Sequence, residues 1–351
     1  MTPQAGATTS RMRTEIFQQP DALARTLVGL ADVRQRLRRL RNTVDRVVFF
    51  ARGSSDNAAI YGRYLCELVV GVPAALGAPS VATVYHRRLD LQRTLAVAIS
   101  QSGRTEEMVE VADWARRCGA TTLAITNTHD SPLVDIVDLP VVTEAGDERA
   151  VPATKTYTSA LLALAGVAEA LSGGRPFGDA LQAVPEQASD LLARAPDADR
   201  LAPILRACTS LSVIGRGFSL ATAVEVALKV EEACGLPAAG LSSADLQHGP
   251  FAIVHEGTGV LVLAAAGGPT LPGLTSLAVR AAQSGARTCG IGGDERLRAA
   301  CQAAVAGADL PEEVAPIVEV IPGQLLTESM ARLLGRDPDA PLGLTKVTQT
   351  R

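Results

Sequence analysis

The sequence predicts an α/β protein made of two doubly wound parallel sheets flanked by helices. Three observations support this prediction. Short apolar runs are each followed by a Gly/Ser turn and a helical pattern, and the arrangement occurs twice along the 351 residues. The length corresponds to about two domains. Aromatic residues make up only 3% of the chain and there are 31 glycines, a composition that lets helices pack closely on a sheet.

The first strand of each predicted sheet has the same context. Val47–Phe50 leads into Arg52-Gly53-Ser54-Ser55, and Leu211–Ile214 leads into Arg216-Gly217-Phe218-Ser219. A second matching pair is Ala96–Ile99 and Val260–Leu263. The pattern therefore indicates an internal duplication. The other predicted strands are Thr122–Ile125, Leu139–Val142, Thr288–Ile291 and Ile317–Ile321.

These elements predict four segments. Residues 1–45 form a helical segment, residues 46–190 and 191–336 form the two sheet domains, and residues 337–351 form an extended tail that closes over the site. The link between the domains is expected in the Ala/Pro-rich region 185–203, where a helical pattern resumes without a strand.

Composition argues against several classes of protein. The formal net charge is −4 and no basic block occurs, which disfavours nucleic-acid binding. The longest apolar stretches, such as Val260–Ala266, are far shorter than a membrane-spanning helix. The N-terminus lacks a signal-peptide pattern, and the six cysteines show no CxxC spacing. We therefore expect a soluble cytoplasmic protein with reduced thiols and without nucleic-acid or membrane partners.

A hydroxyl-rich turn follows the strand Ala96–Ile99. Parallel-sheet geometry places such a turn at the carboxyl end of its strand, where free backbone N–H groups and a helix N-terminus attract anions. The alternative is an ordinary structural connector. The second half has Ala264, Ala265 and Ala266 at the matching position, so the turn itself does not require hydroxyls. The predicted phosphate-binding side chains are Ser100, Ser102 and Thr105, together with Ser54 and Ser55.

The helix predicted over 223–234 carries Glu225, Lys229 and Glu232 on one face. Two interpretations remain open at this point. The three residues form either an exposed, salt-bridged stripe or part of a site. His248, which precedes Gly249-Pro250, is the histidine best placed for proton transfer near neutral pH.

Several separate motifs together resemble a known family. In order they are Gly53-Ser54-Ser55, Ser100-Gln101-Ser102-Gly103, Ala153-Thr154-Lys155, Leu228-Lys229, Glu232, Gln247-His248-Gly249-Pro250 and Gly343-Leu344-Thr345-Lys346. They resemble the sugar isomerase (SIS) domains of glucosamine-6-phosphate synthase. The resemblance implies two tandem three-layer SIS domains and a sugar 6-phosphate ligand. It adds Gln101 to the phosphate contacts, and it implies sugar contacts from Gly53, Val151, Ala153 and Thr154.

The same resemblance implies the roles of the reacting groups. Glu232 would move a proton between C1 and C2, His248 would open the sugar ring, and Lys229 would contact the substrate. Lys346 would form a Schiff base with the open ketose or stabilise charge at that end of the sugar. The loop bearing His248 would cross to the site of a neighbouring subunit, so a homodimer is expected. No metal or redox cofactor is expected.

The resemblance favours one reaction within the family. The synthase has a glutaminase domain with an N-terminal cysteine, whereas here Thr2 follows Met1 and the first cysteine is Cys66. Ser102–Thr105, the Ser-Ser-Ala-Asp run at 242–245 and the ending at 346–350 look closer to the SIS-type glucosamine-6-phosphate deaminases. The expected reaction converts glucosamine 6-phosphate and water into fructose 6-phosphate and ammonia.

Other activities remain open. Within the family they are a phosphosugar isomerase, a synthase-like aminotransferase fed by free ammonia, and a non-catalytic regulator that binds sugar phosphates. Pro237-Ala238-Ala239-Gly240 replaces a His-Ala-Glu-Ala stretch of the synthases, so a galactosamine-type or glycated-amine substrate also remains open. A Rossmann dehydrogenase is disfavoured because Leu220 stands at the third fingerprint glycine.

Overall fold

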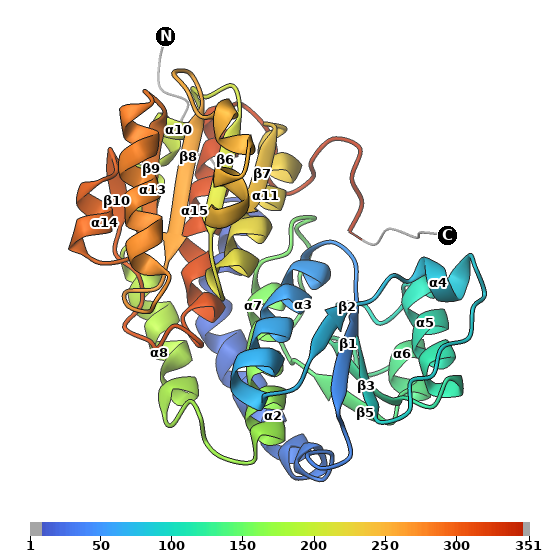
Figure 1. Ribbon diagram of the computed structural model, residues 1–351. Coiled ribbons are helices and arrows are strands. Elements are labelled where there is room, and N and C mark those ends of the chain that lie inside the picture. Colours follow the sequence, from blue (N-terminus) through green and yellow to red (C-terminus); the bar gives the residue numbers. More distant parts are fainter. Residues whose placement is uncertain (1–8, 347–351) are drawn as a thin grey trace.

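The computed structural model describes residues 9–346 and contains two parallel five-stranded sheets (Figure 1). The first sheet has the order β2-β1-β3-β4-β5, and the second has the order β10-β9-β8-β6-β7. If β6 is matched with β1, the two orders are the same. The first sheet consists of β1 (Arg46–Phe50), β2 (Ala74–Leu76), β3 (Thr94–Ile99), β4 (Thr121–Thr126) and β5 (Leu139–Val142). The second consists of β6 (Leu211–Gly215), β7 (Ala238–Ser242), β8 (Gly259–Ala264), β9 (Arg287–Gly292) and β10 (Ala303–Val305).

Helices cover the sheets and join them. The N-terminal helices and those around the first sheet are α1 (Arg11–Phe17), α2 (Gln19–Arg38), α3 (Ser54–Leu65), the π-helix η1 (Cys66–Val70), α4 (Ser80–Thr83), α5 (Glu106–Arg117), α6 (Pro132–Ile136) and α7 (Lys155–Ser172). The region between the sheets contains α8 (Ala180–Ala193), α9 (Ala195–Asp199) and α10 (Ala202–Leu205). Around the second sheet lie α11 (Ser219–Cys234), α12 (Ser243–Gln247), the 3-10 helix η2 (Pro250–Ile253), α13 (Leu271–Gln283), α14 (Glu295–Ala299) and α15 (Pro316–Leu333).

The largest hydrophobic core is continuous between the halves. It includes Tyr61 of α3, Leu161 of α7, Val226 of α11 and Ile321 of α15, each 0% exposed. In Figure 1 α3, α7 and α11 lie between the two sheets. The Tyr61 hydroxyl donates to the Glu313 carbonyl oxygen at 2.6 Å. This shared core holds α11 of the second half against α3 of the first.

Most of the predicted elements are confirmed, and one is wrong. The segment Ile317–Ile321, predicted as a strand, lies in the first turns of α15. Of α15's 18 residues, 15 are buried, polar side chains such as Glu319 and Gln324 among them, so its sequence shows no clear amphipathic period. Periodicity alone does not separate such a helix from a buried strand. The described residues of the predicted N-terminal segment are mainly helical, and the predicted link 185–203 is helical. Residues 1–8 of that segment and 347–351 of the predicted tail lie outside the described residues.

The segment after α15 runs back toward the first sheet (Figure 1). The Val151 backbone N–H donates to the Asp339 carbonyl oxygen at 2.9 Å, and Lys346 forms an ion pair with Glu148. No helix within residues 9–346 combines the length and apolar character needed to cross a bilayer.

Candidate functional site

A cavity of about 340 Å³ lies at the carboxyl edge of the first sheet. Its walls come from both halves of the chain and from the segment after α15. Of the predicted site residues, twelve line it: Gly53, Ser54, Ser55, Ser100, Gln101, Ser102, Thr105, Val151, Ala153, Lys229, Glu232 and Lys346. The fold thus gathers side chains from five separate stretches of sequence into one space.

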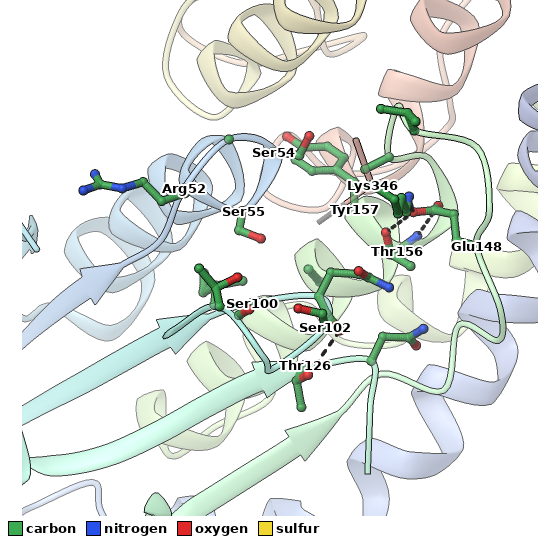
Figure 2. A pocket seen from close by; sticks show the side chains of 18 of the residues that line it. Arg52, Ser54, Ser55, Ser100, Ser102, Thr126, Glu148, Thr156, Tyr157 and Lys346 are labelled. Atoms are coloured by element: carbon green, nitrogen blue, oxygen red, sulfur yellow. Dashed lines mark hydrogen bonds and ion pairs between the residues drawn. The ribbon is translucent and has the colours of Figure 1, made fainter. Parts of the chain in front are cut away.

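Two turns supply the hydroxyl groups. Gly53 precedes α3, and its φ of 57° lies in the left-handed region that favours glycine. The turn after β3 includes Gly103, which has a φ of 61° and lies so close to Ser131 that a Cβ there would come within 2.2 Å of its Oγ atom. Thr105 is the N-cap residue of α5. Figure 2 shows Ser55 from one turn and Ser100 and Ser102 from the other facing the same space.

The Arg52 guanidinium points away from these hydroxyls (Figure 2). Its Nε and Nη2 atoms donate to both carboxylate oxygens of the buried Glu107, at 2.9 and 2.8 Å. Backbone N–H groups, hydroxyls and the Gln101 amide therefore remain as donors of the two turns, as in sites that bind phosphate without a dedicated lysine.

The other side of the cavity carries charged residues of α11. Lys229 is 1% exposed and contacts Glu232, which is partly exposed to the cavity. Burial lowers the proton affinity of the Lys229 ammonium, but Glu225 and Glu232 outweigh this effect and raise its pKa. The interpretation of these residues as an exposed stripe is wrong, because Glu225 and Lys229 are both buried. A carboxylate next to a buried ammonium can exchange protons with a ligand in the cavity.

The sequence analysis missed Glu148, a fully buried acid in the cavity wall. Its carboxylate accepts hydrogen bonds from Thr154 Oγ1 at 3.1 Å and Thr156 Oγ1 at 2.6 Å, and Lys346 Nζ lies 2.7 Å away. Burial raises the pKa of Glu148, but the Lys346 charge and these hydrogen bonds outweigh burial and lower it. In the sequence Glu148 stands between Asp147 and Arg149 and belongs to no periodic pattern or motif. Its place in the cavity wall is therefore visible only in the folded structure.

Asn127 was also missed, although its position offers a signal. It directly follows β4, at the edge where the cavity lies. Asn127 Oδ1 accepts hydrogen bonds from Thr143 Oγ1 at 3.0 Å and from the Ala145 N–H at 2.7 Å. It therefore holds together the loops that follow β4 and β5. Tyr157 of α7 completes this wall, and burial raises the pKa of its phenol.

Two predicted site residues lie outside the cavity wall. Thr154 is buried behind the wall, where its side chain donates to Glu148. His248 is the C-cap residue of α12 and is exposed to solvent. Within this single chain, His248 therefore does not meet the groups of the cavity.

Two lysines of the cavity, Lys229 and Lys346, each lie beside a carboxylate. Among residues 9–346, no cluster of three or more His, Cys, Asp or Glu side chains could hold a metal ion. The arrangement can bind an anion at the hydroxyl-rich turns and transfer protons at another part of the same cavity.

Comparisons with known proteins identify the family of the chain. The SIS domain family matches residues 40–170, which contain the first sheet and most of α7. The glutamine–fructose-6-phosphate aminotransferase (isomerizing) of Thermococcus kodakarensis is 32% identical over 347 residues. The match covers 95% of this chain and 57% of the relative, so the chain spans little more than half the length of that protein.

Solved structures show the same fold over the whole chain. A protein from Silicibacter pomeroyi named as a phosphosugar isomerase is 34% identical, with a TM-score of 0.86; the match covers 94% of this chain and 100% of that one. The glucosamine-6-phosphate deaminase of Thermotoga maritima shares the fold at 23% identity, with a TM-score of 0.74 and coverage of 93% and 100%. The chain belongs to the SIS domain phosphosugar isomerase family.

Proposed function

We propose that this protein converts glucosamine 6-phosphate and water into fructose 6-phosphate and ammonia. The observation that carries the proposal is that the hydroxyl-rich turns and the Lys229–Glu232 pair line the same cavity. Its volume of about 340 Å³ is within the usual range for sites that bind small molecules.

The phosphate binds at the turns after β1 and β3. Ser54, Ser55, Ser100, Ser102 and Thr105 offer hydroxyl donors, and the backbone before α3 and α5 offers N–H groups. Gln101 adds an amide to the same wall. Gly53, Val151 and Ala153 leave room for the sugar carbons, and Thr154 acts indirectly by holding Glu148.

Glu232 moves the proton of the isomerisation. In the open aldose, its carboxylate takes the proton from C2 while O1 gains a proton from Lys229, which gives an enolamine. Glu232 then returns its proton to C1, which leaves an iminium ion at C2. Water adds to C2. As the C2–N bond breaks, one proton of this water passes to the nitrogen, which leaves as ammonia, and the other restores the Lys229 ammonium, so the atoms and protons balance without a redox step. The contact between Lys229 and Glu232 supports this assignment because it keeps the donor and the base together.

Ring opening requires a group that the cavity of one chain does not hold. We assign it to His248 of a second copy, in a homodimer whose subunits complete each other's site. The exposure of His248 supports this assignment, since its ring is available to a neighbouring chain. Lys346 lies at the end of the cavity near Glu148, where its amine can reach a sugar carbonyl after leaving that carboxylate.

We further propose that the second sheet is also a SIS domain, because its strand order repeats that of the first. The proposed domains are residues 46–190 and 191–336, with 337–351 as the closing tail. No metal or redox cofactor enters the proposed reaction.

The 34% identity to a phosphosugar isomerase favours one alternative, ketose–aldose isomerisation without deamination. The same carboxylate would move the same proton. The two reactions differ in whether nitrogen is released.

The deciding assay supplies glucosamine 6-phosphate and follows ammonia and fructose 6-phosphate together. The proposal predicts equal amounts of both products, and a loss of both in Glu232→Gln. Ketose formation from an aldose phosphate without ammonia favours the isomerase. Tight binding of the sugar without any product indicates a regulator and contradicts the proposal.

A further inference from the structure

Glu225 lies on α11, one turn before Lys229, and its side chain is completely buried. It does not line the cavity. The Asn57 side-chain N–H donates to Glu225 Oε2 at 2.8 Å, and the Ser54 side chain also hydrogen bonds to this carboxyl group. Both donors belong to the first turn of α3, which follows the first phosphate-binding turn. Glu225 thus joins the anion site of the first half to the helix that carries the acid–base pair.

The other oxygen of the carboxyl group faces the acid–base pair. Glu225 Oε1 lies 3.6 Å from Lys229 Nζ, too far for a hydrogen bond, and it has no hydrogen-bond partner. Lys229 in turn contacts Glu232. One buried ammonium therefore stands between two carboxylates, and the one that faces the phosphate turn is incompletely satisfied.

Protonation of Glu225 responds to these contacts. Burial has the largest effect and raises the pKa of Glu225. Lys229 and the hydrogen bonds from Asn57 and Ser54 lower this pKa, whereas the Glu232 charge raises it. Together these effects raise the pKa of Glu225 to about 7. Tyr157 of α7 also faces this group, as a buried phenol whose own pKa is raised. The side chains of Asn57 and Ser54 are uncharged.

We propose that Glu225 is a positioning residue that takes up a proton from solvent when an anion occupies the phosphate site, and so couples that site to the Lys229–Glu232 pair. The proposal rests on the proposed function, because it places the phosphate at Ser54. An anion that accepts the Ser54 hydroxyl withdraws a hydrogen bond from Glu225 and adds negative charge nearby. Both changes favour the neutral carboxyl group.

Protonation has a defined effect on the reacting groups. Neutral Glu225 no longer attracts the Lys229 ammonium, which then interacts electrostatically with the Glu232 carboxylate alone. Loss of the neighbouring negative charge also stabilises the Glu232 carboxylate. Binding of the phosphate group therefore prepares the base for the carbon atoms at the other end of the sugar.

The test measures proton uptake on binding of inorganic sulfate, a tetrahedral dianion that does not titrate near pH 7. Calorimetry at pH 7 in two buffers with different ionisation enthalpies gives the number of protons taken up. The wild type is expected to take up as much as about half a proton per site, because a group with a pKa near 7 is half protonated at that pH. Glu225→Gln is expected to take up none.

Tyr61→Phe is the matched control. It removes another hydrogen bond between α3 and the second half, four residues beyond Asn57, but does not touch Glu225. It is expected to keep the wild-type proton uptake. Asn57→Ala is a second variant, for the case in which Glu225→Gln does not fold. Without the Asn57 hydrogen bond, Glu225 is more protonated before sulfate binds. Proton uptake on binding should therefore fall below the wild-type value.

A kinetic measurement separates this role from a purely structural one. In the wild type, kcat should fall as rising pH deprotonates Glu225 in the enzyme–substrate complex. The pH profile of kcat in Glu225→Gln should not show this fall. Sulfate binding without proton uptake in the wild type, or equal uptake in Glu225→Gln, overturns the coupling while leaving the phosphate site intact. Absence of sulfate binding overturns the phosphate site itself, and the coupling with it.

Discussion

The two halves have the same strand order but different turns at the carboxyl ends of their strands. After β3 the first half places Ser100, Gln101 and Ser102, and all three line the cavity. After β8 the second half places Ala265 and Ala266, which do not line it. The second half instead contributes Lys229 and Glu232 through α11. Under the proposed function, one sheet topology therefore serves anion binding in the first half and proton transfer in the second.

Two buried acids, one from each half, differ in how completely they are partnered. Glu148 of the first half has the Lys346 ammonium and two threonine hydroxyls as partners. Glu319 of the second half is also buried, but its Oε1 atom has no hydrogen-bond partner, and burial raises its pKa well above the ordinary value. A fully partnered buried carboxylate stays charged, whereas an incompletely partnered one favours the neutral form.

The largest expected effect concerns the base from the second half. Glu232→Gln should lower kcat about 1,000-fold, because a positioned general base contributes about 10²- to 10⁴-fold. Binding of the sugar phosphate should change little. The neighbouring Glu231 is exposed on the same helix, so Glu231→Gln is the control. Steady-state assays with both variants check this division, and comparable losses in the two would contradict the assignment.

The next effect concerns the anion site of the first half. The double substitution Ser100→Ala, Ser102→Ala gives this turn the apolar character of its counterpart after β8. The dissociation constant for a hexose 6-phosphate should rise at least about 100-fold, since each of the two hydrogen bonds to a charged group is worth about 1.5 kcal/mol or more. The reciprocal change Ala266→Ser should have no effect. Equal affinity of the double variant and the wild type, measured by calorimetry, would show that the anion binds elsewhere.

The third effect tests the partnered acid. Because its folded pKa is lowered, Glu148 contributes stability above its unfolded pKa of about 4.5, and this is lost as pH falls through the folded value. Lys346→Met should therefore reduce the free energy of unfolding by about 2 kcal/mol at pH 7, a value lowered for the partial exposure of Lys346. The deficit should shrink toward pH 4. Urea titrations at both pH values measure it, and a deficit that is independent of pH would argue against the ion pair.

The smallest effect tests the incompletely partnered acid. Glu319 has a raised folded pKa, so its contribution to stability is greatest below the unfolded pKa of about 4.5 and is lost as pH rises toward the folded value. Glu319→Gln removes this loss. Relative to the wild type, it should gain about 1 kcal/mol in unfolding free energy between pH 5 and pH 8. Glu186→Gln, at an exposed position of α8, should show no such gain.

Sequence patterns predicted the central strands and the outer strand β5, but they missed the other three outer strands. Residues of β3 and β8 form apolar runs that are entirely buried. By contrast, β2 and β10 have three residues each, and β7 has the sequence Ala-Ala-Gly-Leu-Ser. Such strands owe their conformation to pairing with a neighbour and carry little propensity of their own. The predicted strand Ile317–Ile321 is wrong for a related reason: α15 is buried almost all round by its neighbours, so its helical conformation leaves little trace in the sequence pattern.

The candidate site was predictable where the chemistry lies in local motifs. The Ser-Gln-Ser-Gly turn and the Glu/Lys face of α11 were identified, and twelve of the predicted residues meet in the cavity. Glu148 and the bridging role of Glu225 could not be identified, because their partners are far away in sequence. Glu225 lies 168 positions from Asn57, and Glu148 lies 198 positions from Lys346.

The most direct test of the division between the halves is a crystal structure of the Glu232→Gln variant with glucosamine 6-phosphate, which should persist in that variant. The account predicts the phosphate group at the turns bearing Ser54 and Ser100, and the C1 and C2 atoms next to residue 232. A phosphate group bound at the turn after β8, or sugar carbons remote from residue 232, would contradict it.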